Sequence, residues 1–175
     1  GLKQKGYDVK ILSFGGGILE KKLVTEGIDY LVFQFNFLAP FKKKIIPLIK
    51  LTFLIRSLKP FAIIPFITVN SKYTGLIWKY TGAQFACWNQ RDEGREVFGT
   101  KLEKYSINNL PAVVSNSYEG RDVLIERLSI KPEKVRIINN GIFIPSKPES
   151  NYWRAKLKLS EDTLIVSMIA SISKY

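Results

Sequence analysis

The sequence predicts an α/β fold in which helices flank a parallel β-sheet. Short apolar runs alternate along the chain with longer segments of helical spacing, the pattern of a parallel sheet with crossover helices. The clearest unit of this kind occupies residues 111–142. Residues 112–114 (AVV) suit a buried strand, and residues 115–117 (SNS) offer caps for a helix. Pro132 stops that helix, and residues 135–138 (VRII) form the second strand.

The remaining elements follow from the same alternation. Strands are expected at residues 8–14, 28–35, 61–67 and 83–88, and helices at residues 18–26, 45–58, 71–80 and 99–109. Pro47 is placed near the first turn of its helix, where the missing N–H is tolerated. Pro65 indicates the end of a strand, because proline cannot donate to a sheet.

The composition changes after Gly141. Residues 145–150 (PSKPES) are typical of a linker, residues 152–159 predict a short helix, and residues 163–170 (TLIVSMIA) an apolar strand. The predicted organisation is a first domain at 1–144, a linker with a short helix at 145–160, and the start of a second domain at 161–175.

Composition excludes several classes of protein. Apolar residues make up 46% of the 175 residues, which indicates a globular chain. Cys87 is the only cysteine and histidine is absent, so a disulfide framework, Ser-His or Cys-His nucleophile pairs and the commonest metal ligand are all excluded. We therefore expect no metal and no cofactor, and a reducing, cytoplasmic environment. The chain contains no apolar run long enough for a transmembrane helix, and its first residues lack a hydrophobic signal region.

The net charge of +12 is unevenly distributed. Residues 30–91 contain no Asp or Glu, yet they hold Lys42, Lys43, Lys44, Lys50, Arg56, Lys59, Lys72, Lys79 and Arg91. Such a region favours an anionic partner, namely phospholipid, nucleotide or nucleic acid. The alternative is a solubilising face with no partner.

The helix at residues 45–58 is apolar almost all round, which is typical of a helix buried on several sides or lying on a membrane. Because it precedes a core strand, we expect it to pack in the core while Lys42, Lys43 and Lys44 touch anionic lipid. A nucleic-acid partner would require exposed aromatics among the basic residues. The aromatics lie in apolar runs and are expected in the core, which argues against nucleic acid: Phe33, Phe35, Phe37, Phe53, Phe61 and Phe66.

The sharpest polar cluster spans residues 89–96 (NQRDEGRE), directly after the strand at 83–88. Ligands of parallel α/β sheets collect outside the carboxyl ends of the strands. Arginines there can clamp a phosphate or carboxylate, and carboxylates can bond sugar hydroxyls. The candidate substrate-binding residues are Asn89, Arg91, Asp92, Glu93 and Arg95. The alternative is a self-neutralising surface loop.

Residues 15–17 (GGG) are interpreted as a flexible turn rather than a phosphate cradle.

The unit at residues 111–142 resembles the end of the N-terminal domain of family 4 glycosyltransferases, which are retaining enzymes of the GT-B fold. The resemblance consists of the run VVSNS, a helix, and then the run KPEKVRIINNGI. The join at residues 6–9 (GYDV) resembles the helix-to-strand turn of that family, which implies that the family's first strand lies upstream of residue 1. Asn139, Asn140 and Gly141 match the turn near the family's interdomain hinge, and Gly141 is expected to have a positive φ.

The resemblance implies a Rossmann-like, acceptor-side domain from the N-terminal half of a GT-B enzyme. The implied activity is transfer of a sugar, with retention, from a nucleotide-sugar donor to a glycan or lipid-linked acceptor in envelope polysaccharide or lipid glycosylation. Peripheral attachment to the inner face of the plasma membrane is a further expectation. The family's donor domain carries two glutamates with seven residues between them, and no pair here has that spacing. We therefore expect this chain alone to be inactive. The competing hypothesis is a basic α/β module that binds nucleic acid or anionic lipid without catalysis.

Overall fold

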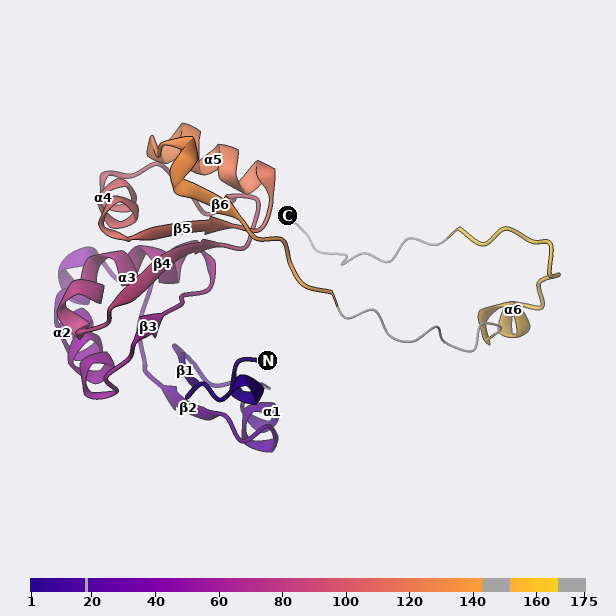
Figure 1. Cartoon of the computed structure of the whole chain (residues 1–175), viewed down its shortest axis with the longest axis horizontal. Coiled ribbons are helices and arrows are strands. Elements are labelled where there is room, and N and C mark those ends of the chain that lie inside the picture. Colours follow the sequence, from indigo (N-terminus) through magenta and orange to yellow (C-terminus); the bar gives the residue numbers. More distant parts are fainter. Residues whose placement is uncertain (18, 143–151, 167–175) are drawn as a thin grey trace. The chain divides into compact units, whose positions relative to one another are not determined.

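The structure is a computed structural model that describes residues 1–17, 19–142 and 152–166. The chain divides into two compact units, residues 1–140 and residues 141–175 (Figure 1). In the second unit the described residues form one helix, α6 (Tyr152–Leu157). Residues 163–166 form no strand, and residues 167–170 of the expected strand lie outside the described residues.

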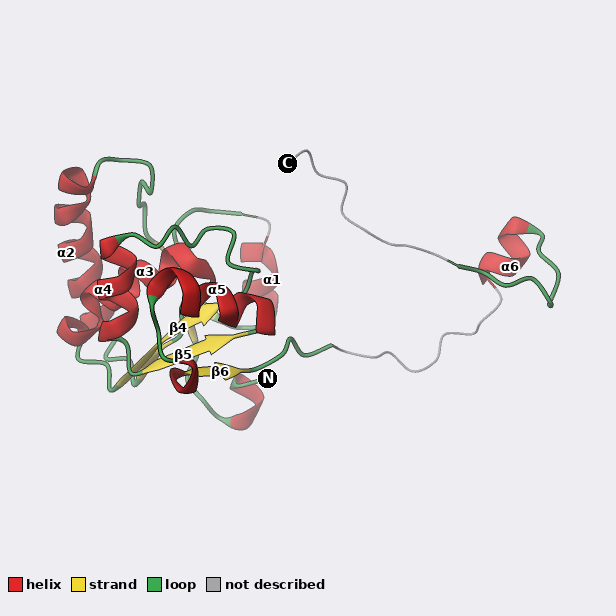
Figure 2. Ribbon diagram, turned by 90° about the horizontal axis from the view of Figure 1, so that it is seen from above, coloured by secondary structure: helices red, strands yellow, loops and turns green. Residues whose placement is uncertain are grey.

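The first unit contains two parallel sheets (Figures 1 and 2). The smaller pairs β1 (Lys10–Ser13) with β2 (Asp29–Val32). The larger has the order β3-β4-β5-β6, with bounds β3 (Ala62–Ile63), β4 (Phe85–Gln90), β5 (Ala112–Ser115) and β6 (Val135–Ile137). In its register Gln90 pairs with Ser115, which pairs with Ile137. The carboxyl ends of β4, β5 and β6 therefore lie together at one edge, and the predicted α/β fold is confirmed.

Helices connect the parallel strands. They are α1 (Leu19–Thr25), α2 (Phe41–Ser57), α3 (Ile67–Thr81), α4 (Lys101–Asn109) and α5 (Tyr118–Leu128), with short 3₁₀ turns η1 (Lys3–Lys5) and η2 (Pro132–Lys134). Helix α3 packs against β4, α4 and α2, while α5 packs against β5 and β6. Every helix and strand predicted between residues 8 and 138 is present.

The buried apolar residues form two clusters. The first lies around the larger sheet and contains Ala86, Trp88, Val97, Ile107, Leu110, Val113, Leu124, Leu128, Ile130 and Val135. The second lies between α2, α3 and the residues around the smaller sheet. It contains Phe35, Leu48, Leu51, Ile55, Tyr73 and Ile77. Helix α2 contributes only the stripe of Leu48, Leu51 and Ile55, which recurs at helical spacing.

Some predicted boundaries shifted, since β3 covers only Ala62–Ile63 and α3 begins at Ile67 rather than at residue 71. Two predictions were wrong. Helix α2 begins at Phe41, so Pro47 lies inside the helix rather than near its first turn. Pro40 precedes the helix with a φ of −55°, and its carbonyl accepts from the Lys43 N–H over 2.9 Å, so the first turn closes four residues earlier than predicted. Gly141 is not among the glycines with positive φ, and it therefore needs no glycine-specific conformation.

The prediction that the aromatics are core residues is correct for half of them. Phe35 is buried, and Phe33 and Phe37 pack against the second cluster. The other three are exposed by 60–70%: Phe53, Phe61 and Phe66. Apolar sequence context did not distinguish the two groups, because burial depends on contacts with other segments of the chain: Phe35 and Phe37, for example, pack against Tyr73 of α3.

Candidate functional site

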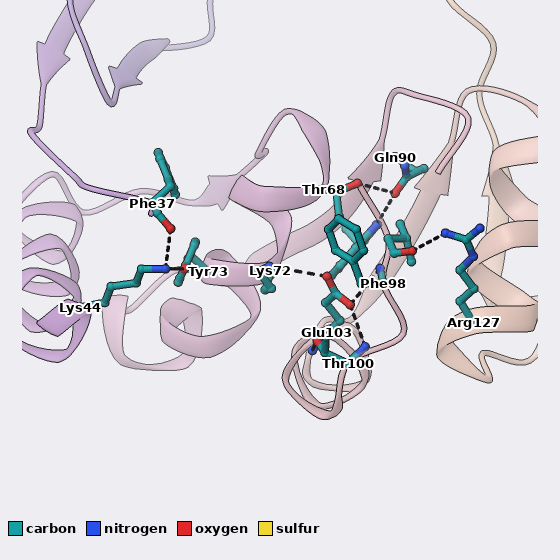
Figure 3. Close-up of polar contacts among 12 residues, drawn as sticks. Phe37, Lys44, Thr68, Lys72, Tyr73, Gln90, Phe98, Thr100, Glu103 and Arg127 are labelled. Atoms are coloured by element: carbon teal, nitrogen blue, oxygen red, sulfur yellow. Dashed lines mark hydrogen bonds and ion pairs between the residues drawn. The ribbon is translucent and has the colours of Figure 1, made fainter. Parts of the chain in front are cut away.

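The candidate site lies at the carboxyl edge of the larger sheet, where Gln90 organises the end of β4. Its side chain is fully buried. Its Oε1 accepts from Trp88 Nε1 over 3.0 Å and from Thr68 Oγ1 over 3.2 Å (Figure 3). Its Nε2 donates to the Asp92 carboxylate over 2.5 Å. A buried amide needs hydrogen-bond partners. These contacts hold the chain in place where it leaves β4.

Asp92 faces inward rather than toward a ligand. Its Oδ1 accepts from Gln90 Nε2 and also from the Gly94 N–H over 2.7 Å. This local pairing is an Asx-type turn, in which the side chain replaces a backbone acceptor. The arrangement gives Asp92 a structural function and leaves its contact with any substrate a prediction.

The loop after β4 is packed closely against the start of α5. Gly94 has a φ of +82°, and a Cβ at this position would overlap the side chain of Val123. A Cβ at Gly120 would lie 2.8 Å from Ser115 Oγ and 3.0 Å from the Asp92 carbonyl oxygen. Because side chains are excluded at both glycines, the loop has one well-defined path over the helix N-terminus.

Polar contacts fix the same loop at its two ends. Asn116 Nδ2 donates to the Arg91 carbonyl over 3.2 Å, and the Asn116 N–H donates to the Gln90 carbonyl over 3.1 Å. Farther along, Arg127 donates to the Val97 carbonyl over 2.6 Å (Figure 3). The residues between these contacts are therefore presented on a rigid support, as a binding site requires.

Arg91 is the predicted site residue that is best placed to meet a ligand. Its guanidinium lies 5.9 Å from the ring centroid of Phe66, which is 60% exposed. Phe66 precedes Ile67, a β-branched residue with a φ of +67°, and such strain often marks a functional turn. Arg91 itself is half-buried. An accessible guanidinium beside an apolar ring suits an anionic group attached to a larger organic ligand.

Asn89 connects the turn that carries Phe66 to the end of β4. Its side chain is buried and donates from Nδ2 to the Pro65 carbonyl over 2.9 Å. The Asn89 N–H donates to Ser71 Oγ over 3.1 Å. The structure therefore brings Asn89 and Arg91 to the same place, with Asn89 positioning the turn and Arg91 partly accessible.

Glu93 and Arg95 are exposed and form an ion pair with each other over 3.1 Å. That pairing matches the alternative of a self-neutralising loop for these two residues. Asn139, Asn140 and Gly141 are also exposed, and they follow β6 at the boundary between the two units. Their role at a hinge stays a prediction.

The three lysines assigned to membrane contact do not behave alike. Lys42 and Lys43 are exposed. Lys44 turns inward, where Nζ donates to the Phe37 carbonyl over 2.6 Å and to the Tyr73 hydroxyl over 2.9 Å (Figure 3). Lys44 therefore fastens α2 to α3 and to the aromatic cluster around Tyr73.

Behind the loop, Glu103 is a fully buried carboxylate on α4. Its Oε2 accepts from the Thr100 N–H over 2.9 Å and from the Phe98 N–H over 3.2 Å, and Thr100 completes a capping box (Figure 3). Its Oε1 lies 3.5 Å from Lys72 Nζ. These contacts explain how the charge is tolerated inside the protein, since a buried carboxylate needs donors and a cation.

Sequence reasoning missed the supporting residues of this site, namely Phe66, Thr68, Gln90 and Asn116. The sequence did contain a signal for two of them. Gln90 and Asn116 are polar residues that directly follow or end apolar strand runs, where parallel sheets place their binding loops. Phe66 carried no such signal, because it lies in an apolar run.

The described residues contain no group of three or more His, Cys, Asp or Glu side chains arranged to hold a metal ion. Residues 15–17 do not form an open phosphate cradle, because the Gly17 N–H donates to Glu20 Oε1 over 3.1 Å. Among the helices described, none is long and apolar enough to cross a membrane.

No protein-family model and no curated protein sequence matches the chain significantly. Solved structures do share its fold. Anabaena Alr3699/HepE, crystallised with UDP and glucose, aligns with a TM-score of 0.63 and 16% identity, over 87% of this chain and 44% of that one. A glycosyltransferase from Rickettsia africae aligns with a TM-score of 0.59 and 19% identity, over 92% of this chain and 44% of that one.

A third match is the apo form of WaaB, a lipopolysaccharide outer core galactosyltransferase. Its TM-score is 0.53 at 12% identity, over 82% of this chain and 48% of that one. The chain thus spans less than half the length of these structures. The three structural matches show that the chain has a GT-B-like glycosyltransferase fold, although the sequence identities are low.

Proposed function

We propose that this chain is the acceptor-side half of a retaining, family 4 glycosyltransferase. The whole enzyme moves a sugar from a nucleotide-sugar donor to a glycan or lipid-linked acceptor in envelope glycan synthesis, in the cytoplasm at the inner face of the membrane. No metal and no cofactor take part in this proposal.

One observation carries the proposal. A chain with a glycosyltransferase-like fold places Arg91 and Phe66 together at the carboxyl edge of its sheet, the position where α/β folds bind their ligands. A guanidinium binds phosphate or carboxylate groups, and both occur in donors and in lipid-linked acceptors. We assign Arg91 to substrate binding, with Asn89 and Asp92 positioning the two turns.

The test is sugar transfer by the whole enzyme with a panel of nucleotide sugars, beginning with UDP-glucose, and mass detection of products. Arg91→Ala is expected to lower kcat/KM about ten- to a hundredfold, as for loss of a charged hydrogen bond. Arg91→Lys is expected to recover part of this, since it keeps the charge without the planar fork. Arg136→Ala, at an exposed arginine of β6, is the matched control and is expected to leave kcat/KM within about twofold.

An unchanged kcat/KM in Arg91→Ala would remove this residue from the site while leaving the fold assignment intact. Absence of transfer with every donor would contradict the proposed activity itself. The isolated 175-residue chain is expected to show no turnover, because no pair of its glutamates has the spacing of the family's donor site.

A further inference from the structure

Helix α2 exposes an apolar face in the most basic part of the chain. Its buried stripe faces the second core cluster. Away from this stripe, the helix carries large apolar side chains with exposures of 45–66%: Ile45, Ile46, Ile49 and Phe53. We call these four residues the α2 outer face. An ordinary surface helix is polar on this side, so the outer face requires an explanation.

The spacing of these residues shows that they form one surface. Residues 46, 49 and 53 are separated by three and four positions, so they lie in a row along one side of a helix. Ile45 lies beside the row, and Phe41, which is 48% exposed, lies one turn before Ile45. The helix has 17 residues and therefore runs for about 25 Å.

Cations border this apolar row. Lys42 and Lys43 lie at its start, Lys50 lies at its middle and Arg56 at its end, and all four are exposed. The helix contains no acidic residue. Within the described residues, no ion pair engages any of these four cations. Arg56 donates to the Tyr80 carbonyl over 3.4 Å, but that acceptor is neutral, so the described residues supply no anionic partner for the four charges.

Polar side chains on α2 do not interrupt the row. The Thr52 hydroxyl donates to the Leu48 carbonyl over 2.7 Å, and the Ser57 hydroxyl donates to the Leu54 carbonyl over 2.7 Å. Both hydroxyls are satisfied within the helix. The α2 outer face is thus an apolar row with a cationic border, the composition of helices that lie in the plane of a membrane interface.

We propose that the α2 outer face binds an anionic lipid bilayer, with the helix parallel to the membrane plane. Isoleucine and phenylalanine side chains enter the boundary between headgroups and acyl chains, and the four cations contact anionic headgroups. Lys44 takes no part, because its ammonium is bonded to Phe37 and Tyr73. The proposal is independent of sugar transfer.

Charge complementarity favours a bilayer over the other occupants. A second copy of this chain would bring two α2 cationic borders together, and like charges oppose that contact. A nucleic acid would satisfy the cations, but it offers aromatic stacking partners rather than a continuous apolar layer, and three of the four outer-face residues are isoleucine.

The experiment is co-sedimentation of the full chain with vesicles of phosphatidylcholine alone or mixed with phosphatidylglycerol, over a range of salt concentrations. We expect binding to the anionic vesicles that weakens as salt increases. Lys42→Ala/Lys43→Ala/Lys50→Ala is expected to weaken it about fivefold per cation removed. Ile46→Ser/Ile49→Ser/Phe53→Ser is expected to abolish binding to the anionic vesicles. Circular dichroism and thermal unfolding would verify that each variant is folded.

Matched controls lie elsewhere on the first unit. Lys131→Ala/Lys134→Ala removes exposed cations near β6, and Val24→Ser removes an exposed apolar side chain on α1. Both are expected to bind vesicles as the unmodified chain does. Wild-type binding by the α2 variants would overturn the proposal. Two other outcomes would also overturn it, if no vesicle binding is seen with any variant. One is a dimer in light scattering that the α2 variants lose, and the other is retardation of an oligonucleotide that the α2 variants lose.

Discussion

Gln90 and Asp92 are joined by a hydrogen bond of 2.5 Å from the buried side-chain amide to the carboxylate. The same carboxylate oxygen holds the Gly94 N–H over 2.7 Å. Asp92 therefore determines the path of the loop that presents Arg91. A loss of activity on changing Asp92 would reflect this structural function as well as any contact with substrate, and measurements of stability separate the two.

Asp92→Ala is expected to lower the free energy of unfolding by about 1–3 kcal/mol, because the buried Gln90 amide loses its shorter hydrogen bond and keeps only the 3.3 Å one to the backbone carbonyl of residue 92. Asp92→Asn keeps an acceptor oxygen and is expected to lose less than half as much. Denaturant unfolding measures both. Glu93→Ala is the control, since its pair with Arg95 is exposed, and its effect is expected to lie within about 0.5 kcal/mol. Equal effects at the two positions would contradict the structural role of Asp92.

Gly94→Ala is expected to destabilise the chain by about 2–4 kcal/mol. The alanine would have to adopt a φ of +82°, and its Cβ would overlap Val123. Thermal or denaturant unfolding measures the change. Gly141→Ala is the matched control, because nothing lies within 4 Å of a Cβ there and its φ is not positive. A near-neutral Gly94→Ala would show that the loop can leave α5 without penalty.

Glu103→Ala is expected to lower the free energy of unfolding by about 3 kcal/mol. It removes the acceptor for the Thr100 and Phe98 N–H groups and leaves Lys72 without its partner. Glu119→Ala, in the exposed first turn of α5, is the control and is expected to change stability by less than about 1 kcal/mol. Combining Glu103→Ala with Lys72→Met should give less than the sum of the single effects, because the two residues are in contact.

The order of elements could be predicted from sequence because each strand–helix–strand step has local signals. The caps and breaks of the 112–137 unit are contained within a few residues, and Ser117 does cap α5 by accepting from the Gly120 N–H over 3.1 Å. The predicted start of α2 was wrong for a local reason too, because Pro47 was placed near the first turn, whereas Pro40 is the residue that precedes the helix.

The orientation of side chains could be predicted less well. Lys42, Lys43 and Lys44 are identical and consecutive, yet only Lys44 faces Tyr73, since the inward side of α2 is set by packing on α3. The same packing leaves Phe53 exposed while Phe35 is buried. Lys44 shares helical spacing with the buried Leu48, Leu51 and Ile55, but α2 is apolar almost all round, so the sequence alone did not show which side faces inward. That side depends on tertiary contacts between segments far apart in sequence.

Cys87 provides the last prediction, which concerns pH. The thiol is buried in β4, and this burial raises its pKa from 9.0 to about 11. Between those values the unfolded chain loses the thiol proton while the folded chain keeps it, so stability falls as pH rises above 9. The expected loss from this group is about 2 kcal/mol at pH 11. Unfolding curves from pH 8 to pH 11 for the unmodified chain and for Cys87→Ala isolate the effect from tyrosine and lysine titration, which both chains share. Parallel pH profiles in the two chains would show that Cys87 ionises equally in the folded and unfolded states.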